Sequence, residues 1–187
     1  MPNSFHPVLA VFASDKGPGD PERSSIMSQA GSYFARKGAR IVALAEDGIL
    51  PVPLITSARA AGGEVTLIGE EDAILPTALV DVPLERIADR EARLRRLVEL
   101  SDAIVGLPGS LASTASLYAT WVAARAGGRR KPVLLLNRNR AFEVIRGFAA
   151  DVISHDVRHL ERHVQFSDSV EDVWSRITRT VTAPKSR

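Results

Sequence analysis

Residues 101–121, SDAIVGLPGSLASTASLYATW, combine a short apolar run, a turn and a helix-forming segment. The run at 103–107 is uninterrupted, which is typical of a parallel strand covered on both faces. Pro108 and Gly109 end it, and a helix start beyond them offers N–H groups and a dipole that favour an anion. We therefore expect a site for a phosphate or carboxylate here. Its expected residues are Pro108, Gly109, Ser110, Ser113, Thr114 and Ser116.

Strand and helix patterns alternate along the rest of the chain. Strands are expected at 7–13, 40–45, 64–69, 79–80, 132–136 and 164–166, and helices at 21–37, 51–62, 83–100, 110–127, 141–149 and 169–181. Such alternation predicts an α/β fold, a Rossmann-like three-layer α/β/α sandwich with a mostly parallel sheet. We expect one nucleotide-binding domain over 1–187, with 182–187 as a tail.

The composition excludes several kinds of site and partner. The 24 basic and 22 acidic residues nearly balance, so nothing favours nucleic acid as a partner. The absence of cysteine excludes disulfides, thiolate metal sites and a cysteine nucleophile. No export signal or membrane-spanning run is apparent, so we expect a cytoplasmic protein with no membrane partner. His155 and His159 are spaced as ligands on a helix would be, but their charged neighbours favour an exposed polar helix, so we expect no metal and no cofactor.

Arginines line the helix expected at 83–100. Arg86, Arg90 and Arg93 fall within its apolar face, so they either contact a ligand at the carboxyl edge of the sheet or extend to solvent along that face.

The same segments resemble a known family. PGSLASTAS is similar to the PGGxGTxxE motif of the Lonely Guy phosphoribohydrolases, long misannotated as lysine decarboxylases. Pro108 and Gly109 match, and Ser113 keeps a hydroxyl in place of threonine. Ser110 and Ala112 replace glycines, and Ser116 replaces the glutamate. The resemblance extends to the helix that leads into the strand, where it implies a catalytic role for Arg93.

A second turn also resembles the family. Gly48-Ile49-Leu50 matches part of its glycine-rich turn, but Glu46 and Asp47 precede it and would repel a phosphate. The resemblance implies binding of a nucleotide or similar phosphorylated molecule, with hydrolysis lost together with the glutamate. Two alternatives remain: a divergent phosphoribohydrolase that uses a nearby carboxylate, and a carrier related to the molybdenum-cofactor carriers. The candidate catalytic residues are Arg93, Glu46 and Asp47, with Asp15 as a further carboxylate, and the remaining ligand-binding candidates are Arg90, Gly48 and Ser14.

The helix after Pro108-Gly109 carries more apolar surface than one sheet-facing stripe needs. Leu117, Tyr118, Trp121 and Val122 lie on it, and aromatic residues are common interface anchors. The resembled family pairs through this region, so we expect a homodimer. The alternative is that Trp121 belongs to the protein's own core.

Overall fold

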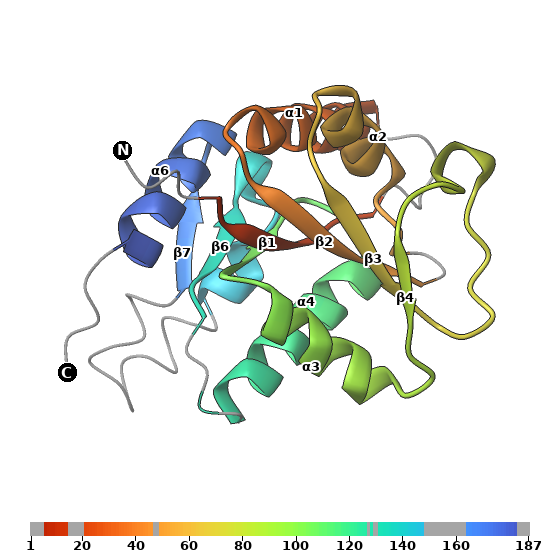
Figure 1. The fold of residues 1–187 in the computed structure, drawn as a ribbon. Coiled ribbons are helices and arrows are strands. Elements are labelled where there is room, and N and C mark those ends of the chain that lie inside the picture. The colour runs from red at the N-terminus through yellow and green to blue at the C-terminus, as the bar shows by residue number, and fades with distance from the viewer. Residues whose placement is uncertain are drawn as a thin grey trace.

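A computed structural model of the protein describes residues 6–14, 21–46, 49–126, 128, 131–147 and 164–182. A seven-stranded sheet lies between two layers of helices (Figure 1). Its strands are β1 (Val8–Phe12), β2 (Arg40–Ala45), β3 (Val65–Gly69), β4 (Leu84–Arg86), β5 (Ala103–Gly106), β6 (Val133–Leu136) and β7 (Val164–Ser167). They are ordered β4-β3-β2-β1-β5-β6-β7, and every neighbouring pair is parallel. The predicted α/β/α sandwich is confirmed.

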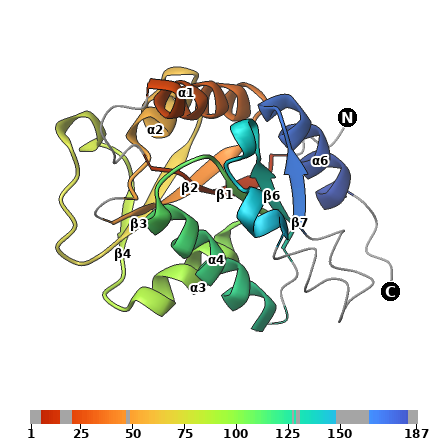
Figure 2. The same cartoon turned by 180° about the vertical axis from the view of Figure 1, so that it is seen from behind.

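The helices divide between the two faces of the sheet. α1 (Pro21–Arg36), α2 (Val52–Ala60) and α6 (Val170–Thr182) cover one face, and α3 (Arg90–Leu100) and α4 (Leu111–Ala126) cover the other (Figures 1 and 2). Two short 3-10 turns, η1 (Thr77–Leu79) and η2 (Arg138–Arg140), lie in connections, and 143–147 is helical. None of the helices in the described part of the chain is long and apolar enough to cross a membrane.

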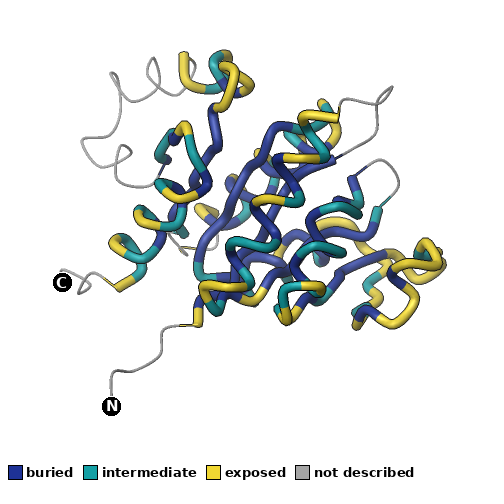
Figure 3. Tube along the Cα trace, turned by 90° about the horizontal axis from the view of Figure 1, so that it is seen from above, coloured by how far each residue is buried: buried dark blue, intermediate teal, exposed yellow. Residues whose placement is uncertain are grey.

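The sheet separates two apolar cores, one under each helical layer. Every residue of β1, β5 and β6 is buried, as a continuous apolar run in a doubly covered strand requires. In Figure 3 the buried residues follow the strands and the inward sides of the helices. Consecutive side chains of a central strand therefore enter opposite cores.

Gly31 brings the helices of the first layer into backbone contact. A Cβ atom at this position of α1 would lie 2.2 Å from the carbonyl oxygen of Leu54 and 2.4 Å from the Ser57 hydroxyl, both on α2. Only glycine lets the two helices approach this closely.

The segment 77–100 differs from its prediction. We expected a strand at 79–80 and a helix from Pro83, but the first segment ends the turn η1, and 84–86 form the edge strand β4 beside β3. Helix α3 begins only after Asp89, whose carboxylate accepts the N–H of Ala92 as an N-cap. Arg86 is consequently not on the helix. It donates instead to the carbonyl oxygens of Glu70, Glu71 and Ala73 in the loop after β3.

Candidate functional site

The predicted anion turn lies where the strand order reverses. β1 connects through α1 to β2 on one side, whereas β5 connects through α4 to β6 on the other, and ligands of open α/β folds bind at such a point. The turns after β1 and β5 touch here: a Cβ atom on Gly109 would lie 2.9 Å from the Ser14 backbone nitrogen and 2.5 Å from the Ser113 hydroxyl. Ser14 is itself buried. The structure therefore brings Ser14 and Gly109 together.

The hydroxyls of this turn serve the start of α4. Ser110 accepts the N–H of Ser113 at 3.2 Å, which makes it the N-cap. Ser113 and Thr114 donate their hydroxyls back to the Ser110 carbonyl oxygen at 2.9 and 3.1 Å. These three side chains thus complete the first helical turn, and Thr114 also lines a cavity described below.

Arg93 lies at the centre of a network on the β2 side of the cleft. Its side chain is 2 % exposed, and Nε donates to Glu46 at 2.8 Å. Nη1 donates to the carbonyl oxygens of Ile87 and Ala88 at 2.8 and 2.7 Å, and Nη2 to Glu70 at 3.1 Å. Four of the five guanidinium N–H groups are therefore directed at protein acceptors. Arg93 holds the start of α3 to the carboxyl ends of β2 and β3.

Arg90 extends this network to α4. Its Nη2 donates to the Ser116 hydroxyl at 3.1 Å, and its Nε lies 3.9 Å from Glu46. Ser116 stands where the resembled motif has its glutamate, so here a hydroxyl accepts from Arg90 at that position. The Glu46 carboxylate, 11 % exposed, is the more buried of the two acidic groups that contact Arg93 in this half of the site, since Glu70 is 53 % exposed.

A second half of the site opens toward β6. A cavity of about 240 Å³ lies between the start of α1, the turn after β5 and the segment after β6. The described residues that line it are Glu22, Arg23, Ile26, Pro108, Gly109, Thr114, Arg138, Asn139, Ala141 and Phe142. Sequence reasoning missed Arg23 and Arg138. The available signal was Asn137-Arg138-Asn139-Arg140, a polar run directly after a buried strand.

Several predicted residues lie outside the described ranges. These are Asp15, Asp47, Gly48, His155 and His159. Among the residues that are described, no three His, Cys, Asp or Glu side chains gather closely enough to hold a metal ion.

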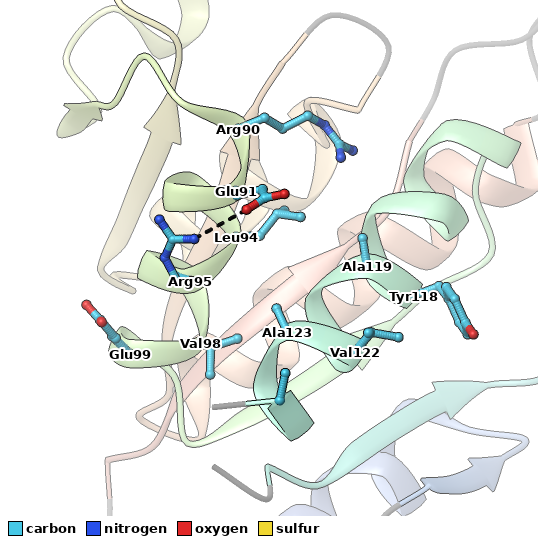
Figure 4. Close-up of a pocket in the computed structure, with 11 residues that line it drawn as sticks. Arg90, Glu91, Leu94, Arg95, Val98, Glu99, Tyr118, Ala119, Val122 and Ala123 are labelled. Atoms are coloured by element: carbon cyan, nitrogen blue, oxygen red, sulfur yellow. Dashed lines mark ion pairs between the residues drawn. The ribbon is translucent and has the colours of Figure 1, made fainter. Parts of the chain in front are cut away.

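A separate groove runs between α3 and α4, with a volume of about 680 Å³. Figure 4 shows Val98 of α3 pointing toward Ala123 of α4, while Arg90, Glu91, Arg95 and Glu99 lie along the α3 side. Of the four residues expected at a dimer surface, Tyr118 and Val122 are each 46 % exposed, whereas Leu117 and Trp121 are buried in the core beneath α4. The groove is thus apolar at its floor and charged along one rim.

The fold of the chain, rather than its sequence, matches known proteins. No model of a known protein family matches the sequence, and no curated protein matches it. Solved structures do. One is the X-ray structure of a protein designated TM1055, with 21% sequence identity, a TM-score of 0.66, and coverage of 94% of this chain and 99% of that one. The chain has a Rossmann-like fold shared with that protein.

Carrier proteins share the same fold. The molybdenum cofactor carrier protein of Chlamydomonas reinhardtii is 18% identical, with a TM-score of 0.67, and the match covers 96% of this chain and 100% of that one. The molybdenum cofactor binding protein of Rippkaea orientalis is 18% identical, with a TM-score of 0.64 and coverage of 95% and 99%. The Lonely Guy family has this fold as well. Likeness at these identities shows the architecture, which the sequence predicted.

Proposed function

We propose that the protein binds a nucleotide or a similar phosphorylated small molecule at the carboxyl edge of its sheet and does not hydrolyse it. The observation that carries the proposal is the contact between the turns after β1 and β5. Gly109 there lies against the backbone of Ser14, beside a cavity lined by arginines. A cavity with two arginines among its described lining residues, at the reversal of strand order, suits an anionic ligand.

Position 116 carries a serine, which is poorly suited to hydrolysis. Splitting a base from a ribose phosphate requires a group that can stabilise positive charge or transfer a proton, and a serine hydroxyl is a poor substitute for a carboxylate. Ser116 is moreover already bonded to Arg90. A divergent hydrolase would have to use Glu46 instead, the carboxylate that approaches Arg90 most closely in this network.

Thermal shift measurements with a panel of nucleoside monophosphates test the binding proposal. We expect a ligand at 100 times its dissociation constant to stabilise the protein by about 2.7 kcal/mol. Each binder is then incubated with the protein and assayed for free base by chromatography, and we expect none above background. Base release that Glu46→Gln abolishes would establish the divergent enzyme, and the absence of a shift with any phosphorylated compound would refute binding.

A phosphorylated pterin is the second candidate ligand. It is favoured by the two structures named above as molybdenum cofactor carrier and binding proteins, which match nearly the whole chain. Molybdenum cofactor released from a molybdoenzyme therefore belongs in the panel. A carrier is expected to bind the cofactor and then return activity to a cofactor-free molybdoenzyme.

We propose further that the chain forms a homodimer through the groove between α3 and α4. The groove is apolar at its floor, and Tyr118 and Val122 are half exposed at its α4 side. Its α3 rim alternates in charge through Arg90, Glu91, Arg95 and Glu99. A closed two-fold interface pairs a surface with itself. If the two α3 helices run antiparallel across the two-fold axis, Arg90 of one copy lies opposite Glu99 of the other.

Val122→Glu is expected to convert the dimer to a monomer, because the added carboxylate at the α4 side of the groove would be desolvated by the second copy. Light scattering on purified protein measures the mass. Val80→Glu is the control, since Val80 is also an exposed valine but is not among the residues that line the groove, and it should leave the dimer intact. A parent protein that remains monomeric at high micromolar concentration would rule out the interface.

A further inference from the structure

The arginines of the site differ in what they bind. On the β2 side, Arg93 donates to two carboxylates and two carbonyl oxygens, and Arg90 bonds Ser116. On the β6 side, Arg138 makes one long hydrogen bond, 3.3 Å to the neutral amide oxygen of Gln29. Within the described residues, no carboxylate lies at ion-pair distance from Arg138. Its charge is thus available to a ligand, whereas most of the N–H groups of Arg93 are not.

The segment that carries Arg138 is fixed to the rest of the fold. The buried Asn137 accepts the N–H of Phe142 at 2.8 Å and donates to Glu143 at 3.0 Å. Asn139 donates to Glu22 on α1 at 2.6 Å, a bond between residues 117 apart in the sequence. Arg138 is therefore presented from a segment anchored at both sides, which reduces the entropy lost when it binds.

Among the described residues that line the cavity, two arginines favour an anion. Arg23 and Arg138 reach its wall from α1 and from the segment after β6, and Glu22 is the one acidic residue among the described residues that line it. The Glu22 carboxylate accepts from Asn139, so part of its hydrogen-bonding capacity is used. Two guanidinium groups from separate elements suit a phosphate, whose oxygens can accept paired N–H groups.

The size of the cavity limits what enters it. Its volume of about 240 Å³ is below the roughly 300–1,000 Å³ typical of sites that enclose a whole drug-sized ligand. It can hold the phosphate end of a ligand, and the remainder would extend along the carboxyl edge. Pro108, Gly109 and Thr114 belong to both the cavity and the predicted anion turn, so the two are continuous.

We propose that Arg138 and Arg23 bind the phosphate group of the ligand on the β6 side of the cleft, and that Arg90 and Arg93 keep the β2 side in shape. This assignment rests on the proposed function. It moves the anion contact from the arginines of α3, which the sequence singled out, to two arginines that come together only in the folded protein. The ligand class is a sugar phosphate or nucleotide that enters phosphate first.

Isothermal titration at low ionic strength tests the assignment, with inorganic phosphate and ribose 5-phosphate as probes. Arg138→Ala is expected to weaken binding of both by about tenfold or more, the loss of a hydrogen bond to a charged group. Arg138→Lys should fall between, because it keeps the charge and loses the paired geometry. Arg23→Ala should act in the same direction as Arg138→Ala.

Arg140→Ala is the matched control. Arg140 follows in the same segment, has a left-handed backbone like Asn139, and does not line the cavity. It should leave the affinity within about twofold, since it alters net charge alone. Circular dichroism melts confirm that each variant is folded at the titration temperature.

The outcomes separate this assignment from the broader proposal. If Arg90→Ala weakens phosphate binding and Arg138→Ala does not, the anion lies on the β2 side, and binding of a phosphorylated ligand still stands. If nucleotides stabilise the parent protein while neither small probe binds it, the phosphate-first assignment is overturned. If nothing phosphorylated binds, both proposals fail.

Discussion

Arg93→Ala is expected to lower the free energy of unfolding by about 3–5 kcal/mol, the range for removing one partner of a buried ion pair. The substitution leaves the Glu46 carboxylate in a largely buried position with Arg90 3.9 Å away. It also removes the donor to the carbonyl oxygens of Ile87 and Ala88. Urea unfolding monitored by circular dichroism gives the loss directly.

Arg95→Ala supplies the comparison for that measurement. Arg95 lies on the same helix, but its side chain is 59 % exposed and its ion pairs with Glu91 and Asp89 span 3.6 and 3.9 Å. Exposed pairs of this kind contribute about 0–1 kcal/mol. If Arg93→Ala cost no more than Arg95→Ala, the network would not hold α3 in place.

A double variant separates the charge from the packing. Arg93→Met combined with Glu46→Leu removes both buried charges and fills much of the same volume, and such replacements are often neutral or stabilising. We expect it to be more stable than Arg93→Ala alone. A double variant less stable than Arg93→Ala would show that the uncompensated Glu46 carboxylate is not what makes the single substitution costly.

Gly31→Ala is expected to destabilise the protein by about 3 kcal/mol, the upper part of the usual range for overpacking. Helix propensity alone predicts the opposite sign, since alanine is favoured over glycine by about 1 kcal/mol within a helix. The added Cβ atom would meet the Leu54 carbonyl oxygen at 2.2 Å, and this backbone atom can move only if α1 and α2 separate. Thermal unfolding of the purified variant measures the change.

Gly147→Ala is the matched control for that experiment. Gly147 is also helical, but an added Cβ atom would meet nothing within 4 Å. Its substitution should therefore be neutral or slightly stabilising. Equal effects at the two glycines would contradict close helix packing at Gly31.

The sequence predicted the central strands well because each is a continuous apolar run with covered faces. It failed at 77–100, where Pro83 is a favourable first residue for a helix. The competing interaction was pairing with the open edge of β3, where Leu84 aligns with Leu67. Three residues contain too little pattern to predict such a strand. Asp89, the actual N-cap, is a residue type that favours a helix start, but Pro83 led to an earlier predicted start.

The sequence indicated the separate turns of the candidate site, but not how they come together. The sequence placed Pro108 and Gly109 at a strand end before a helix, but it did not predict the contact of Gly109 with Ser14. Glu46 and Arg93 were both placed at the carboxyl edge. Their pairing was not predicted, because it depends on how far α3 extends over β2. Arg23 and Arg138 lie far apart in the sequence, and only the ordering of β1, β5 and β6 brings them to one cavity.

The position of β1 in the sheet has a consequence during synthesis. One edge of β1 pairs with β2, and the other edge pairs with β5, which is synthesised later. The Val8 N–H donates to the Asp102 carboxylate, which lies 94 residues further along the chain. At about 5–20 residues per second, the ribosome needs roughly 5–20 s to supply that partner. Throughout this interval the nascent chain exposes an apolar strand edge, which can template association with other chains. We therefore expect the protein to be most prone to aggregation before β5 has been translated, and chaperone capture in that interval should matter more for its yield than the stability of the finished fold.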